Sequence, residues 1–316
     1  GIHAEIGDEA QTVYLPKIRT NAKDGITKIN HIEALPKAKI IDTVSYSSLL
    51  PGKEYTVTGT LMNKKIGEPV LIDGKKVTAG TTFVAEKAEG SVEVVFEFDA
   101  SAIAGTTVVA FESMEYKGIE VAVHADIEDE NQTVYIPDVH TTATATDTED
   151  HVTGANKEVT ITDEVALTGL KVGNEYTVKG VLMDKTTGKE LLVDEEQIVS
   201  EETFVADKAD MTITLTYTLD ASKLAGTTTV VFETLYTEGK EVGRHHEIDD
   251  EGQTVYIPEI HTTAADQKTE INHTKSEETA TIIDTVHYSH LLPGKEYTVK
   301  GVFMNKETGE EVLIDD

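Results

Sequence analysis

The sequence has no cysteine and no tryptophan among its 316 residues, and only 27 basic residues against 58 acidic ones. Without cysteine, neither disulfides nor thiolate metal sites can stabilise the fold. The net charge of −31 excludes a nucleic-acid partner, which needs a basic surface to displace counterions from phosphate. No apolar run approaches the roughly 20 residues that span a bilayer, so we expect no membrane insertion in this segment. A β protein with this composition must be stabilised by some other means.

An internal repeat of 121 residues organises the chain. The residues that recur at this spacing are His3, His124 and His245; Gln11, Gln132 and Gln253; Thr20, Thr141 and Thr262; and Gly52, Gly173 and Gly294. We expect residues 1–16 to be the last strand of a preceding repeat, 17–137 and 138–258 to be complete domains, and 259–316 to be the first part of a following repeat. The chain is then a window on a longer array.

Within each repeat the apolar residues alternate with polar ones. Residues 211–219 and 55–61 follow this period of two, which predicts strands with one buried face. Glycine-containing turns at Gly67, Gly188 and Gly309 mark hairpins, and Asp99 and Asp220 each begin about one helical turn that ends at a glycine. Many short strands in about 120 residues predict an all-β fold of tandem immunoglobulin-like sandwiches, with a barrel as the alternative.

Positions that are 121 residues apart form one repeat column. Five such columns hold the same polar residue in both complete repeats. They are Thr20, Asp42, Glu112, His124 and Gln132 in the first, and Thr141, Asp163, Glu233, His245 and Gln253 in the second. The carboxylates lie inside apolar strand runs, where desolvation raises a pKa and can keep one acid protonated near neutrality. Such an acid can polarise the glutamine carboxamide oxygen, while the histidine removes the threonine proton. The expected product is a Thr–Gln ester within each domain. We expect the reaction to need no metal and no cofactor.

These residues resemble the Thr-Gln ester-bond domains, or VaFE repeats, of Gram-positive surface adhesins. The naming motif is matched by residues 109–112, Val-Ala-Phe-Glu, and nearly by residues 230–233. The histidine eight residues before the glutamine of Gln-Thr-Val and the threonine near each repeat start also match. The resemblance implies an immunoglobulin-like fold with a self-generated ester joining Thr20 to Gln132 and Thr141 to Gln253, assisted by the acids and histidines of the same repeat. Thr142 and Thr263 stand beside the proposed nucleophiles, but Asn21 fills that column in the first repeat, so the shared threonine is the better choice.

From this position of the crosslink we expect a structural stalk of a cell-wall-anchored, extracellular adhesin, resistant to force and proteases. Its partners would be neighbouring repeats of the same chain, with a host-surface ligand bound by a missing tip domain. Because each threonine is consumed once, the chain is not a turnover enzyme. Gln11 and Thr262 lack partners in this chain and should stay uncrosslinked.

Three alternatives are open. A glycan- or receptor-binding repeat would normally show exposed aromatics at a common site, and tryptophan is absent. A turnover hydrolase would use the same polar residues but keep its threonine free. The acidic runs at residues 126–130 and 247–251 could bind calcium, but they lack the dense ligands and fixed glycine of an EF-hand loop, so a solvated edge is favoured.

Overall fold

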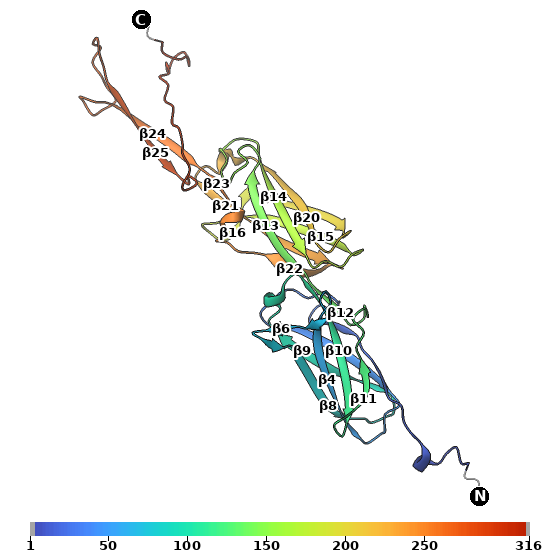
Figure 1. Cartoon of the computed structure of the whole chain (residues 1–316). Helices are drawn as coiled ribbons and strands as arrows, with labels where there is room; N and C mark the ends of the chain where they lie inside the picture. The colour runs from blue at the N-terminus through green and yellow to red at the C-terminus, as the bar shows by residue number, and fades with distance from the viewer. Residues whose placement is uncertain (1–3, 314–316) are drawn as a thin grey trace.

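Alternating apolar and polar residues form β-strands throughout residues 4–313, the part of the chain that a computed structural model describes (Figure 1). Two β-sandwiches follow one another along an extended molecule, and the two ends of the chain lie at its opposite ends (Figure 1). Within these residues the helices are short 3-10 turns, and none is long enough or apolar enough to cross a membrane. The all-β, tandem sandwich prediction is confirmed.

The first sandwich has two antiparallel sheets. One contains β1 (Lys17–Arg19), β2 (Ala22–Asp24), β3 (Ala38–Ser47) and β9 (Gly90–Phe98). The other contains β4 (Glu54–Asn63), β5 (Glu68–Pro69), β8 (Thr78–Val84), β10 (Thr106–Tyr116), β11 (Ile119–His124) and β12 (Thr133–Ile136). A small hairpin joins β6 (Leu71–Ile72) to β7 (Lys75–Lys76). Strands β3 and β10 lie inside their sheets, so both carry side chains into the core between them.

The second sandwich repeats this plan. Its smaller sheet contains β13 (Asp138–Ala145), β14 (Val159–Thr168) and β20 (Met211–Leu219). Its larger sheet contains β15 (Glu175–Asp184), β16 (Lys189–Glu190), β19 (Val199–Val205), β21 (Thr227–Thr237), β22 (Lys240–His245) and β23 (Thr254–Ile257). A hairpin of β17 (Leu192–Val193) and β18 (Glu196–Gln197) completes it. The strand expected at residues 211–219 is β20, with the same bounds.

Four short 3-10 turns occur among the described residues: η1 (Glu9–Gln11), η2 (Ala100–Ile103), η3 (Ala221–Lys223) and η4 (Glu251–Gln253). Each begins after an aspartate whose side chain accepts a backbone N–H, as N-cap residues do. The helical turns expected after Asp99 and Asp220 are confirmed, and Gly105 and Gly226 follow them with positive φ.

Each sandwich has its own hydrophobic core. In the first, fully buried side chains such as Ile40, Val57 and Phe96 come from both sheets. The second core is built in the same way around Ile161, Val178 and Tyr217. Burial of each such side chain stabilises the fold by about 1.5–3 kcal/mol before entropy is counted. The two sheets are thus held face to face, with the polar columns inside them.

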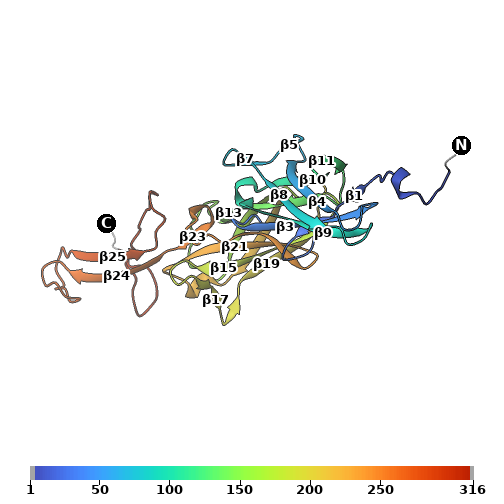
Figure 2. The same ribbon diagram turned by 90° about the horizontal axis from the view of Figure 1, so that it is seen from below.

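After the second sandwich the chain forms a ribbon of β24 (Glu259–Asp266) and β25 (Ile282–Ser289), and Figure 2 shows it projecting away from the two sandwiches. Phe303 is 61% exposed, whereas Leu61 and Leu182 in the same repeat column are fully buried. No second sheet covers these side chains among the described residues. The ribbon therefore has the strand pairing found at the start of each sandwich, but no hydrophobic core forms around it among the described residues.

The connection between sandwiches is a single residue. Strand β12 ends at Ile136 and β13 begins at Asp138, with Pro137 between them, and Pro258 stands likewise between β23 and β24. Proline fixes its own φ and restricts the residue before it, which stiffens so short a connection.

Gly59 of β4 pairs with Glu112 of β10, and the Phe96 ring occupies the space where a side chain at residue 59 would lie. A Cβ there would be 2.5 Å from Phe96 Cζ. We therefore predict that Gly59→Ala lowers the free energy of unfolding by about 1–3 kcal/mol through overpacking. Urea unfolding in a Thr20→Ala background measures it, so that no crosslink hides the loss.

The matched control is Thr58→Ala at the neighbouring exposed position, with an expected change within about 0.5 kcal/mol. Equal effects of the two changes would show that Phe96 does not depend on the glycine.

Candidate crosslink site

The first and last segments of each sandwich meet at its polar centre. Thr20 lies between β1 and β2, next to β3, whereas Gln132 directly precedes β12, which pairs with β10 of the other sheet. A backbone hydrogen bond from Ala22 N to Asn131 O, 2.9 Å long, joins the two segments. Residues 112 positions apart are thereby brought into contact.

In the first sandwich the carboxamide of Gln132 contacts both expected partners. Its Nε2 donates to Thr20 Oγ1 and to Glu112 Oε2, and all three side chains are buried. Glu112 is in register with Gly59 on one side and His124 on the other, so it stands at the middle of its sheet. Nucleophile, electrophile and acid therefore share one desolvated site.

The second sandwich repeats the arrangement. Glu233 Oε2 accepts from Gln253 Nε2 at 3.0 Å and from Thr141 Oγ1 at 3.2 Å. One carboxyl oxygen thus contacts both the hydroxyl and the amide. Thr142 is exposed on the opposite face of β13, so the threonine of the shared column, and not its neighbour, faces the site.

A pair of carboxyl groups lies behind each glutamine, one from each sheet. Asp42 of β3 lies close enough to Glu112, and Asp163 of β14 to Glu233, for the charge of each aspartate to act on the glutamate. Burial, and then the charge of Asp42, raise the pKa of Glu112 to about 10. Burial raises the pKa of Asp163 to about 6, and burial and the Asp163 charge raise that of Glu233 well above its usual value. The glutamate is therefore the protonated member at neutral pH.

The histidines lie beside this pair without reaching the threonine. His124 Nε2 is 2.8 Å from Asp129 Oδ2, and His245 Nε2 is 2.8 Å from Asp250 Oδ2. Within residues 4–313 no hydrogen bond joins either histidine to its threonine. Thr20 Oγ1 instead accepts from Gln132 Nε2.

The orientation of the amide differs from the expectation. The acid was expected to contact the carboxamide oxygen, but in both sandwiches the glutamate contacts Nε2. Gln132 Oε1 and Gln253 Oε1 are buried without a hydrogen-bond partner. The contact therefore favours proton transfer to the nitrogen over polarisation of the carbonyl.

Sequence reasoning missed the aspartates that hold the histidines. Asp129 Oδ1 also accepts from Asn131 N at 2.8 Å, which shapes the turn that leads to Gln132. Glu130 accepts from Lys64 Nζ at 2.8 Å and from the Tyr135 hydroxyl at 3.0 Å. The repeat could have revealed these residues, because the same residue types recur 121 positions later and make the same contacts. They are Lys185, Asp250, Glu251 and Tyr256.

The acidic runs are largely exposed, as the solvated-edge interpretation expected, although Asp129 and Glu130 also have specific partners. Between residues 4 and 313, no group of three or more histidine and acidic side chains is arranged to hold a metal ion.

One aromatic column distinguishes the two sites. Phe96 in the first sandwich corresponds to Tyr217 in the second, whose buried hydroxyl has no hydrogen-bond partner among the described residues. Burial, and then the charges of Asp163 and Glu233, raise the pKa of Tyr217 far above its usual value, so the phenol stays neutral beside the acid pair.

The unpaired candidates lie apart. Gln11 ends the exposed turn η1, and Thr262 pairs with Val286 in the β24–β25 ribbon. The two lie toward opposite ends of the molecule (Figure 1). His3 lies outside the described residues.

Comparison with known proteins gives a family match over most of the chain. The model of the T-Q ester bond containing domain matches residues 16–136, 137–257 and 258–314. A search of curated proteins found no match.

Two solved structures illustrate the structural similarities. A bacterial adhesin from Mobiluncus mulieris containing intramolecular disulfide, isopeptide and ester bond cross-links is 14% identical, with a TM-score of 0.33 over 88% of this chain and 99% of that one. A glycosyl hydrolase family 2 member from Bacteroides cellulosilyticus is 10% identical, with a TM-score of 0.31 over 75% of this chain and 31% of that one. Scores this low carry no functional argument.

The raised pKa of Glu112 predicts how an uncrosslinked first sandwich responds to pH. The folded state holds this proton more tightly than the unfolded state, where the pKa is 4.5. The stabilisation is therefore fully present below about pH 4.5 and is lost as pH rises toward 10. Hydrogen exchange of the β10 amides in a Thr20→Ala variant, measured across this range in urea, should show a falling free energy of unfolding.

Glu112→Gln in the same background is the control, because it cannot ionise and should flatten the profile. A parent variant whose stability rises between these pH values would contradict the neutral glutamic acid.

Proposed function

Because the chain belongs to the family of T-Q ester bond containing domains, we propose that Thr20 is joined to Gln132, and Thr141 to Gln253, by esters that form without another enzyme. The observation that carries the proposal is a threonine, a glutamine and a glutamic acid linked by hydrogen bonds at each site. Gln132 Nε2 joins Thr20 to Glu112, and Glu233 Oε2 joins Thr141 to Gln253.

The reaction exchanges one bond for another. Thr20 Oγ1 bonds to Gln132 Cδ, the Cδ–Nε2 bond breaks, and ammonia leaves. Ionised Asp42, whose buried oxygens have no hydrogen-bond partner among the described residues and whose carboxyl lies near Thr20, accepts the hydroxyl proton. Glu112, protonated and in contact with Nε2, gives its proton to the departing nitrogen. The proton on Asp42 then passes to the neighbouring Glu112 carboxylate, which restores the pair and balances the reaction.

This assignment gives the histidine a supporting role. A charge on His124 favours the ionised form of Asp42, and the hydrogen bond to Asp129 fixes the imidazole in place. The base expected from the sequence is therefore replaced by the acid pair. Holding the hydroxyl and the amide together in a rigid core supplies the remaining acceleration, because an amide is a poor electrophile.

The crosslink closes a loop of 112 residues, which in the chain-entropy model stabilises a domain by about 4.7 kcal/mol. Its place in the covalent path matters more. Tension that enters at Thr20 leaves through the ester at Gln132, and Thr141 follows nine residues later. The sheets between them carry no load.

The chain is thus a stalk of a surface adhesin, with each sandwich locked against force and proteases. We place it outside the cell, attached to a Gram-positive wall, with neighbouring repeats as its direct partners. A host-surface ligand would be bound by a domain beyond this stretch. Support comes from the family, the in-line crosslinks and the one-residue connections between sandwiches.

The intact mass of the folded chain should be lower than the sequence mass by one ammonia for each complete sandwich. Thr20→Ala or Gln132→Ala should restore one ammonia, because the bond cannot form there. Glu112→Gln should fold without crosslinking the first sandwich, because no acid remains to protonate Nε2. Electrospray mass spectrometry under denaturing conditions measures each case.

Thr142→Ala is the matched control, since that hydroxyl points away from the site, and it should retain both losses. The full unreacted mass in well-folded parent protein would refute the ester.

A further inference from the structure

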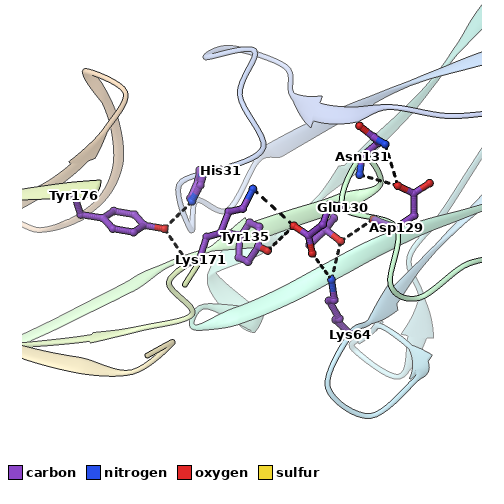
Figure 3. Close-up of polar contacts among 9 residues, drawn as sticks. His31, Lys64, Asp129, Glu130, Asn131, Tyr135, Lys171 and Tyr176 are labelled. Atoms are coloured by element: carbon purple, nitrogen blue, oxygen red, sulfur yellow. Dashed lines mark hydrogen bonds and ion pairs between the residues drawn. The ribbon is translucent and has the colours of Figure 1, made fainter. Parts of the chain in front are cut away.

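A buried histidine joins the two sandwiches. His31, in the loop before β3, is fully buried, and its Nε2 lies 2.7 Å from the hydroxyl of Tyr176 in β15 of the following sandwich (Figure 3). The imidazole stacks on Tyr135 with ring centroids 5.2 Å apart and meets the Tyr176 ring edge-on at 5.6 Å. The crosslink chemistry uses none of these three residues.

The surroundings of His31 favour the neutral imidazole. The Tyr176 hydroxyl accepts from Lys171 N–H at 2.8 Å and can give its own proton to His31 Nε2. A protonated imidazole would instead place a charge in a fully buried joint near Lys171.

Charged groups surround the ring pair. Lys171 Nζ lies 5.6 Å from the Tyr135 ring centroid and 3.7 Å from Glu130 Oε2 (Figure 3). Arg244 of the second sandwich forms an ion pair with Glu33 of the first. Glu130 lies two residues before Gln132 and also accepts hydrogen bonds from Lys64 and Tyr135. The joint is therefore continuous with the turn that presents the first glutamine.

The next junction lacks this chemistry. Val152 stands in the repeat column of His31, and Leu292 in that of Lys171. The hydroxyl of Tyr297, which corresponds to Tyr176, accepts from Leu292 N as Tyr176 does from Lys171 N, but no histidine contacts it among the described residues. An ion pair of Lys295 with Asp150, 2.6 Å long and largely exposed on the lysine side, is present instead. Ion pairs of that kind contribute little to stability.

We propose that the end of the first sandwich around His31, Tyr135 and Glu130 is a docking surface for one kind of partner: the leading end of a following repeat that carries tyrosine and lysine at the positions of Tyr176 and Lys171. This docking holds the pair in one orientation and is released by protonation of His31. Junctions of the second kind, with valine in the histidine column, remain free to bend. The inference goes beyond the ester and holds whether or not the ester forms.

The pH window follows from the groups that face His31. Burial, and then the charge of Lys171, lower its pKa from 6.5 to about 4. Docking is therefore at full strength above about pH 6.5 and weakens as pH falls toward 4. Burial raises the pKa of Tyr176 to about 12, so it does not titrate in this range. Burial acts to raise the pKa of Glu130, but the hydrogen bonds from Lys64 and Tyr135 hold it below its usual value, so it stays ionised through most of the window.

Because the chain has no cysteine, two introduced cysteines can carry the only spin labels. Lys87→Cys and Lys208→Cys place them at equivalent exposed positions of the two sandwiches. Double electron–electron resonance at neutral pH should give one narrow distance distribution for this labelled parent. His31→Val, which introduces the residue that the second sandwich carries in that column, and Tyr176→Phe should each lose the narrow peak. The parent should lose it reversibly as pH falls toward 4.

His273→Val is the matched control, since His273 occupies the same repeat column but is exposed, and the narrow peak should persist. Intact mass measured on every sample separates this result from the ester, because ammonia loss should not change. A narrow peak retained in both His31→Val and Tyr176→Phe, or in the parent down to the pKa of His31, would overturn the proposal.

Discussion

The contact between two carboxyl groups from facing sheets, with a glutamine amide against one of them, is the interaction on which this structure depends. Asp42 and Glu112 are fully buried, and so is Gln132. Ionising both acids there would be very costly, so one of them must keep a proton. The burial that makes ionisation of this core costly also supplies the protonated acid that the proposed crosslinking reaction requires. The second sandwich reaches the same state with Asp163 and Glu233.

The fold delivers these groups through its topology. The first segment of each sandwich lies against the turn before its last strand, so a bond between them spans nearly the whole domain. Connections of one proline would then set successive proposed crosslinks almost end to end. The proposed stalk arises from this order. The proposed joint at His31 would add a fixed angle between the first two sandwiches, and the next junction has valine in that column.

Much of this was predictable because it is periodic. Alternation over residues 211–219 predicted β20, and the 121-residue register identified Thr20, Glu112 and Gln132 before their contact was known. What depends on side-chain direction was not predictable in this way. The acid contacts Nε2 instead of the carbonyl oxygen, and Asp129 in an acidic turn holds the histidine. The role of His31 could not be predicted from the repeat, because the second sandwich has valine in that column and contacts between sandwiches need not recur with the repeat.

Single-molecule pulling on the chain, held beyond Thr20 at one end and beyond Gln253 at the other, tests most directly that force bypasses the folded sheets. The account predicts no unfolding step of either sandwich up to rupture of the tether. The Thr20→Ala, Thr141→Ala double variant should instead release two steps, each of about 370–400 Å for 112 residues less the folded length. Unfolding steps of that size in the parent protein would contradict the central claim.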